Sequence, residues 1–125
     1  RGGGGFECLA IECKTNTGAY DPAAMSDERL AHVLNTLYEL GAVSKHTADE
    51  LTRGLMQGPS FFRKELWRHD LSNGLTTISE LGRKGEKGKS VTRSNARVVA
   101  ALFASLEHFD SNAIYLGQQP LDPTS

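Results

Sequence analysis

The stretch PSFFRKELWRHDLSNGLTTISEL, residues 59–81, contributes most to the fold that the sequence predicts. Pro59 suits the first position of a helix, because its missing N–H needs no partner there. Helical three- and four-residue steps separate the members of one stripe: Trp67, Leu71, Gly74, Ile78 and Leu81. This spacing predicts an amphipathic helix that ends before Gly82 and has its weakest point at residues 72–74.

Two further helices are predicted before this stretch and one after it. Ser26 begins the first as an N-cap, and leucines at helical spacing continue it to a stop at Gly41. The second starts at Thr47, the first residue of a capping box. The last begins after Ser94, and its apolar stripe consists of Val98, Val99, Leu102, Phe103, Leu106 and Phe109.

The N-terminal part of the chain contains the one convincing strand, residues 6–14, with Leu9 and Cys13 on one face and Cys8 on the other. We expect residues 1–5 to be a flexible glycine-rich start and residues 117–125 an extended tail. We therefore expect a mainly α protein: one domain over residues 1–125, with about four packed helices and one or two short N-terminal β-strands.

The composition is that of a folded domain, with 38% hydrophobic and 23% charged residues among 125. No apolar run approaches the roughly 18 residues that cross a bilayer, and the N-terminus lacks the pattern of a signal peptide. Cys8 and Cys13 are the only cysteines, too few for a disulfide framework. We expect an intracellular, cytoplasmic protein that does not associate with membranes.

Positive charge is concentrated in one segment of the chain. Residues 83–97 carry Glu86 and six cations, which are Arg83, Lys84, Lys87, Lys89, Arg93 and Arg97. The segment therefore has a net charge of +5, and because the whole chain carries −1, the remainder carries −6. The sequence predicts one basic patch on an otherwise acidic molecule.

The basic segment GRKGEKGKSVTRSNAR, residues 82–97, is predicted to be a mobile loop. Cationic side chains bind phosphates, and glycines let main-chain N–H groups approach phosphate oxygens closely. Ser90, Thr92 and Ser94 add hydroxyl donors. We expect a non-catalytic module whose six cations contact RNA or DNA phosphates within a nucleoprotein assembly, without reading bases. The alternative interpretation is a solvated surface loop.

A second alternative function rests on residues 11–14, IECK. This segment resembles the E-x-K end of the motif of the PD-(D/E)xK nucleases. The resemblance implies that Glu12 binds a divalent metal and that Lys14 orients water or stabilises charge. The family also takes an acidic ligand from a preceding strand, whereas this chain offers only Glu7, on the same short segment.

The segment LYELGAVSKHTADEL, residues 37–51, resembles a DNA-reading helix-turn-helix. Ala42 follows the turn glycine and disturbs the usual register, and Asp49 and Glu50 suit phosphates poorly. Ordinary packing of two helices is the other interpretation. An apolar helical face also leaves open the first alternative function, a protein-interaction or self-assembly domain with a protein partner or a homo-oligomer.

Aromatic residues gather near the start of the third predicted helix, at Phe61, Phe62 and Trp67. Phe61 and Phe62 cannot face the same side of a helix, so we expect one of them to be exposed. Three cations lie close in the sequence: Arg63, Lys64 and Arg68. The group is a secondary candidate for stacking on a base, with burial in the core as the ordinary alternative.

Histidines are spread over separate predicted elements, at His32, His46, His69 and His108. No pair of them has the local spacing of a metal site. The sequence therefore predicts no metal, no cofactor and no set of catalytic residues, and we expect a protein that is not an enzyme.

Overall fold

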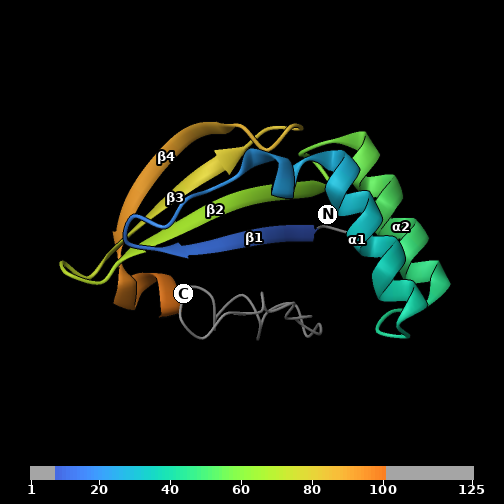
Figure 1. The fold of residues 1–125 in the computed structure, drawn as a ribbon, viewed down its shortest axis with the longest axis horizontal. Coiled ribbons are helices and arrows are strands. Elements are labelled where there is room, and N and C mark those ends of the chain that lie inside the picture. The colour runs from blue at the N-terminus through green and yellow to red at the C-terminus, as the bar shows by residue number, and fades with distance from the viewer. Residues whose placement is uncertain (1–7, 101–125) are drawn as a thin grey trace.

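The structure is a computed structural model that describes residues 8–100. It contains a four-stranded sheet and a pair of helices beyond one end of that sheet (Figure 1). The elements follow in the order β1 (Cys8–Thr15), η2 (Pro22–Met25), α1 (Asp27–Glu39), α2 (Lys45–Gln57), β2 (Phe62–Asp70), β3 (Leu75–Leu81) and β4 (Lys87–Ser94). Residues 95–100 form a helical segment after β4.

The sheet is mixed, with the strand order β1-β2-β3-β4. β1 runs parallel to β2, while β2–β3 and β3–β4 are antiparallel pairs. A parallel pair needs a long crossover, and η2, α1 and α2 form that crossover between β1 and β2. No described strand pairs with the outer edge of β1 or of β4. Among residues 8–100, no helix combines the length and apolar character needed to cross a membrane.

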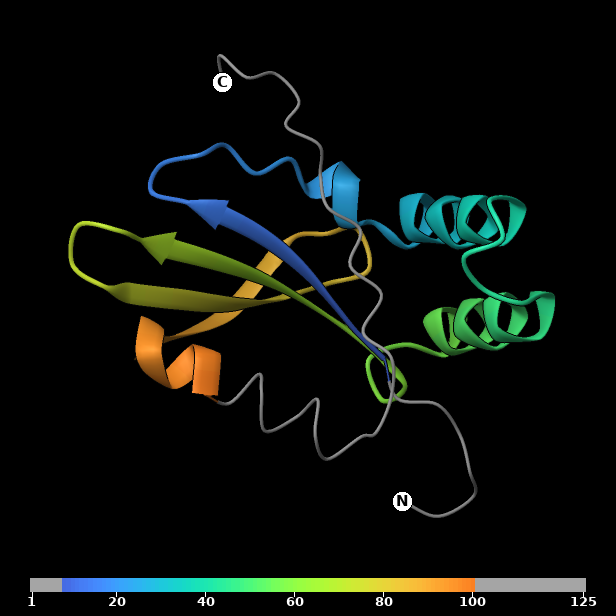
Figure 2. The ribbon, with the colours of Figure 1, turned by 90° about the horizontal axis from the view of Figure 1, so that it is seen from below.

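α1 and α2 lie side by side, joined by a tight turn (Figures 1 and 2). The predicted N-cap of α1 is confirmed, because Ser26 Oγ accepts a hydrogen bond from Arg29 N at 3.2 Å. Gly41 follows α1 with a φ of 78°, as expected of a helix-ending glycine. α2 begins before Thr47, because Ser44 is its N-cap and accepts from Thr47 N at 3.0 Å.

The hydrophobic core joins the helix pair to the first residues of β1 and β2. One buried cluster consists of Leu34, Leu37, Leu55 and Phe62, with Cys8 and Ala10 packed against it. A second consists of Met25, Leu66 and Leu81 and continues the core under η2. The helices therefore cover the end of the sheet where β1 and β2 begin, and leave β4 at the side of the molecule.

The predicted mainly α fold with about four packed helices is wrong, and the error lies in residues 59–81. These residues form β2, a turn and β3 in place of a third helix. Asn73-Gly74 is a strong hairpin signal, and Gly74 adopts a φ of 69° in that turn. Leu71, assigned to the helical stripe, is 65% exposed at the turn.

Polar residues in the interior explain why the strands were missed. Lys64, Thr76 and Ser79 are buried, so the inward positions of β2 and β3 do not show the alternation of apolar and polar residues that marks a strand. Trp67 and Ile78, eleven positions apart in the helical stripe, are instead paired across the β2–β3 hairpin. The three- and four-residue steps between the apolar residues of 67–81 therefore arose by chance, because these residues belong to two strands and the turn between them.

The other predictions concern the two ends of the chain. The predicted N-terminal strand is confirmed as β1. The helix start after Ser94 is also confirmed, because Ser94 Oγ accepts from Arg97 N at 3.2 Å. The glycine-rich start, the tail at 117–125 and the stripe positions Leu102, Phe103, Leu106 and Phe109 lie outside the described residues.

Candidate functional site

The basic segment is not the mobile loop that the sequence predicted. Residues 82–86 form a turn, Lys87–Ser94 form β4, and residues 95–100 are helical. β4 pairs with β3 over most of its length, with Ser90 opposite Ser79 and Arg93 opposite Thr76. Glycines and charged residues are typical of loops. Because no residue of β4 is buried, its sequence lacks the regular apolar positions by which a strand is recognised.

The turn at residues 82–86 is anchored to η2. Gly85 adopts a φ of 81°, and a side chain at this position would collide with the main chain of Pro22. Tyr20 O–H donates a hydrogen bond to Gly85 O at 2.6 Å. The glycine is therefore required by a close approach of two main chains, and it does not mark a flexible phosphate-binding loop.

Arg83 differs from the other five predicted cations because, within residues 8–100, it alone pairs with a carboxylate. Its guanidinium donates to Asp27 Oδ2 at 2.8 Å and to Met56 O at 3.0 Å. Asp27 also accepts from Lys64 Nζ at 2.8 Å, and Lys64 Nζ donates further to Met25 O at 2.6 Å. Arg83 thus ties the turn to α1 and to the end of α2, which is a structural role.

The remaining five cations are Lys84, Lys87, Lys89, Arg93 and Arg97, and all are exposed. Among residues 8–100, none of the five forms an ion pair with a carboxylate. Arg93 Nη1 donates to Thr92 O at 3.0 Å. Three of these cations belong to β4 itself, so positive charge lines one edge of the sheet.

Alternation along β4 divides its side chains between the two faces of the sheet. Arg93 and Val91 lie opposite Thr76 and Ile78, and Lys89 alternates onto the same face. Ser90 and Thr92 occupy the other face, where Ser90 Oγ and Ser79 Oγ are hydrogen-bonded at 2.8 Å. The hydroxyl groups predicted to assist binding are thus on the face away from Lys89 and Arg93, and Ser94 is in addition occupied as the cap of the following helix.

The aromatic candidate is split by the strand geometry. Phe62 is buried at 6% exposure and Phe61 is 39% exposed, as expected for neighbours that face opposite ways. Lys64 is buried, and Arg68 Nη1 donates to Asn16 O and Gly18 O at 3.0 and 2.7 Å. Trp67 is the one aromatic residue of this group on the face of Lys89 and Arg93, a relation that the strand pairing reveals.

The residues of the nuclease resemblance lie next to each other on β1. Lys14 Nζ and Glu12 Oε2 are 3.6 Å apart, and both side chains are partly buried. Within residues 8–100, no three His, Cys, Asp or Glu side chains are grouped closely enough to hold a metal ion. The described part of the chain therefore places no three-ligand group at Glu12 for the metal clamp that this chemistry needs.

The cysteines do not provide an activated nucleophile. Burial raises the pKa of the Cys8 thiol to about 11. The pKa of Cys13 is also raised, first by burial and then by the negative charge of Glu12. Because the thiolate is the reactive form, both thiols are held in their unreactive state at neutral pH.

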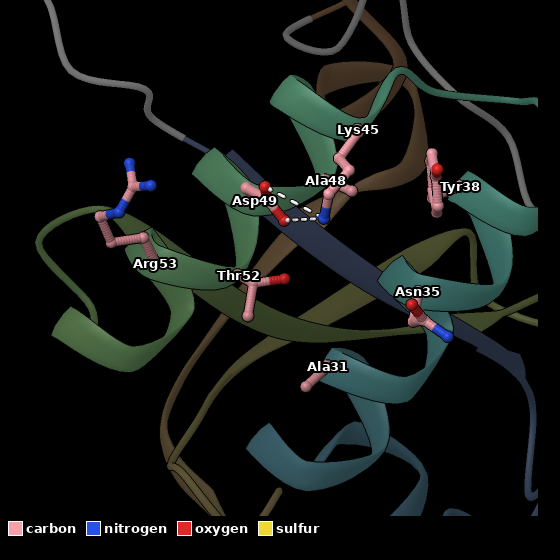
Figure 3. A pocket seen from close by; sticks show the side chains of 8 residues that line it. All are labelled: Ala31, Asn35, Tyr38, Lys45, Ala48, Asp49, Thr52 and Arg53. Atoms are coloured by element: carbon pink, nitrogen blue, oxygen red, sulfur yellow. Dashed lines mark hydrogen bonds and ion pairs between the residues drawn. The ribbon is translucent and has the colours of Figure 1, made fainter.

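A hollow of about 440 Å³ lies between α1 and α2 (Figure 3). Its lining consists of Ala31, Asn35, Tyr38, Lys45, Ala48, Asp49, Thr52 and Arg53. Lys45 pairs with Asp49 at 3.4 Å and lies over the ring of Tyr38, 5.6 Å from its centre. These charges satisfy each other, so the hollow offers less to a ligand than the cations of β4, which have no carboxylate partner within residues 8–100.

Comparisons with known proteins add no assignment to this geometry. No family model matches the chain, and no curated protein and no solved structure is similar enough to count as a match.

Proposed function

We propose that β4 and its flanking segments bind the phosphate backbone of a nucleic acid. One observation carries the proposal: Lys84, Lys87, Lys89, Arg93 and Arg97 are exposed, and none forms an ion pair with a carboxylate among residues 8–100. A cation without an internal partner loses no ion pair when it binds a phosphate. Arg83 is left out of this site because Asp27 and Met56 already hold its guanidinium.

The position of the cations supports a polyanion over a small anion. Side chains two residues apart on a strand are separated by about 6.8 Å, so Lys89 and Arg93 lie about 14 Å apart along β4. Lys87 lies beyond a register shift, opposite Leu81 and on the other face, so the three cations follow the edge of the sheet and do not surround one point. A paired strand also presents them with less conformational freedom than a loop, which lowers the entropic cost of binding. Contacts of this kind hold a backbone without reading its sequence.

The test replaces Lys87, Lys89 and Arg93 together by Ala. A matched control replaces Arg29, Lys45 and Arg53, three exposed cations of α1 and α2, and removes the same total charge. Fluorescence anisotropy with labelled DNA and RNA fragments measures affinity. We expect the β4 variant to lose affinity on the order of tenfold or more at low salt, and the control variant to lose much less.

Two results would contradict the proposal. Equal losses in both variants would mean that net charge alone attracts nucleic acid. Charged side chains on an edge strand also prevent strands of two copies from pairing. If the β4 variant kept full affinity but formed dimers or larger species in gel filtration, Lys87, Lys89 and Arg93 would serve that protective role instead.

A further inference from the structure

A row of mostly apolar side chains crosses the face of the sheet that carries Lys89 and Arg93. Cys13 is paired with Trp67, Trp67 with Ile78, and Ile78 with Val91, so the row extends from β1 to β4. Val91 is 46% exposed, and Trp67 and Ile78 are half-buried. We call these four residues the Trp67 row.

Cations border the row where it reaches β4. Lys89 and Arg93 are the next residues of β4 on the same face, one on each side of Val91. On β2, the indole N–H of Trp67 donates to Glu65 Oε1 at 2.8 Å, and Arg63 pairs with Glu65 Oε2 at 3.2 Å. Arg63 thus offsets the charge of Glu65, whose hydrogen bond orients the indole. Glu80 lies opposite Glu65 on this face, so the negative charge stands at one end of β3 and the cations of β4 flank Val91.

On the side of the β2–β3 turn, the row is bounded by the helical segment at residues 95–100. His69 Nδ1 and Thr76 Oγ1 are 2.9 Å apart, and Thr76 Oγ1 donates to Asn95 Oδ1 at 2.5 Å. These bonds seat the helical segment at 95–100 over Thr76, which is fully buried. Figure 2 shows this segment on the opposite side of the sheet from residues 16–26, which join β1 to α1.

From this arrangement we infer that the nucleic acid is single-stranded and that it places a base on the Trp67 row. The inference rests on the proposed function, because Lys89 and Arg93 would hold the phosphates on either side of that base. Adjacent strands are about 4.8 Å apart, so Trp67 lies about 10 Å from β4 across β3. A base stacks on an aromatic or apolar surface whatever its identity, whereas a duplex keeps its bases in its own stack.

The positive charges of Lys89 and Arg93 beside the Trp67 row favour a single-stranded nucleic acid over an apolar protein surface. A second copy of the chain would bring its own Lys89 and Arg93 to the same place and would be repelled. A single strand supplies both chemistries that the face needs, phosphates for the cations and flat bases for the row.

Trp67 is the only tryptophan of the chain, so its fluorescence reports on the row directly. The probes are a short oligodeoxythymidine, its duplex with oligodeoxyadenosine, and inorganic polyphosphate. We expect the single strand to quench Trp67 and to bind more tightly than the duplex, while polyphosphate binds without quenching. Trp67→Leu should weaken the single strand roughly 5- to 150-fold and leave polyphosphate affinity unchanged, and Trp67→Phe should retain most of the affinity.

The outcomes separate this inference from the proposed function. If single strand, duplex and polyphosphate bind alike and Trp67 is not quenched, the base site is wrong while phosphate binding stands. If no probe binds, both are wrong. A change of Trp67 emission with protein concentration alone would make the row an interface between copies. If Trp67→Leu does not fold, the quenching of the wild-type protein and the affinity of Trp67→Phe still decide whether a base binds at the Trp67 row.

Discussion

At the scale of single residues, the buried Lys64 shows how a charged side chain can organise a fold. Its side chain is 4% exposed, and its ammonium group donates to Met25 O, Asp27 Oδ1 and Arg83 O. These acceptors belong to η2, α1 and the turn before β4, so one side chain joins three segments. In the sequence Lys64 stands between Arg63 and Glu65 and is indistinguishable from a surface charge.

Removing this ammonium group should destabilise the protein strongly. Lys64→Met leaves the buried Met25 O without this donor and removes one of the two cations that neutralise Asp27, and it should lower the free energy of unfolding by about 3–5 kcal/mol. The matched control is Lys45→Met, whose ion pair with Asp49 is exposed and should contribute less than about 1 kcal/mol. Urea denaturation measures both variants. Equal midpoints would show that the Lys64 bonds are not important for stability.

Ionisation of Tyr20, which contacts the turn at residues 82–86, should make the stability of the protein depend on pH in the alkaline range. Burial, with smaller effects of Glu12, Asp21 and Glu86, raises the pKa of Tyr20 from 10.0 to about 12. The unfolded chain therefore ionises first, and the free energy of unfolding should fall as the pH rises from about 10 to about 12. Tyr20→Phe should lose about 1 kcal/mol at pH 8, with its O–H bond to Gly85, and show a smaller alkaline decline. Identical alkaline declines of the melting temperature in the two proteins would contradict this.

At the scale of elements, signals within a few residues of each other predicted the helix ends and the first strand correctly. Ser26 and Gly41 bound α1 as expected, and the apolar density of residues 8–14 identified β1. β2 and β3 were missed because the decisive facts are not local: Lys64 is buried only because acceptors arrive from η2, α1 and the turn. β4 contains no buried residue, and nothing in its own sequence distinguishes it from a loop.

The turn at residues 82–86 should be sensitive to substitution, in contrast to a mobile loop. Gly85→Ala has to strain a left-handed backbone and displace the main chain of Pro22, and should cost more than about 2 kcal/mol of folding free energy. Gly41→Ala is the matched control, because Gly41 has a φ of 78° and open space around it, and should cost about 1 kcal/mol. Thermal melts compare the two. A Gly85 variant as stable as the Gly41 variant would show that the turn is not anchored to η2.

At the scale of the whole molecule, positive and negative charge are separated. Residues 83–97 hold a net charge of +5 in a chain of net charge −1. That separation was visible in the sequence, but its geometry was not. No sequence signal shows that Arg83 reaches Asp27, 56 positions earlier, and is thereby removed from the binding surface. The pairing of β4 with β3 in turn places Lys89 and Arg93 beside the Trp67 row.

The salt dependence of nucleic-acid binding tests the central claim most directly, because each phosphate that a cation binds releases counterions. The affinity of a short oligodeoxythymidine is measured at several salt concentrations for the wild-type protein and for the variant with Ala at positions 87, 89 and 93. We predict a steep decline for the wild-type protein and a slope flatter by about 2 for the variant, roughly 0.7 for each of the three phosphates that the variant no longer neutralises. Equal slopes for the two proteins would contradict the claim that β4 holds the phosphates.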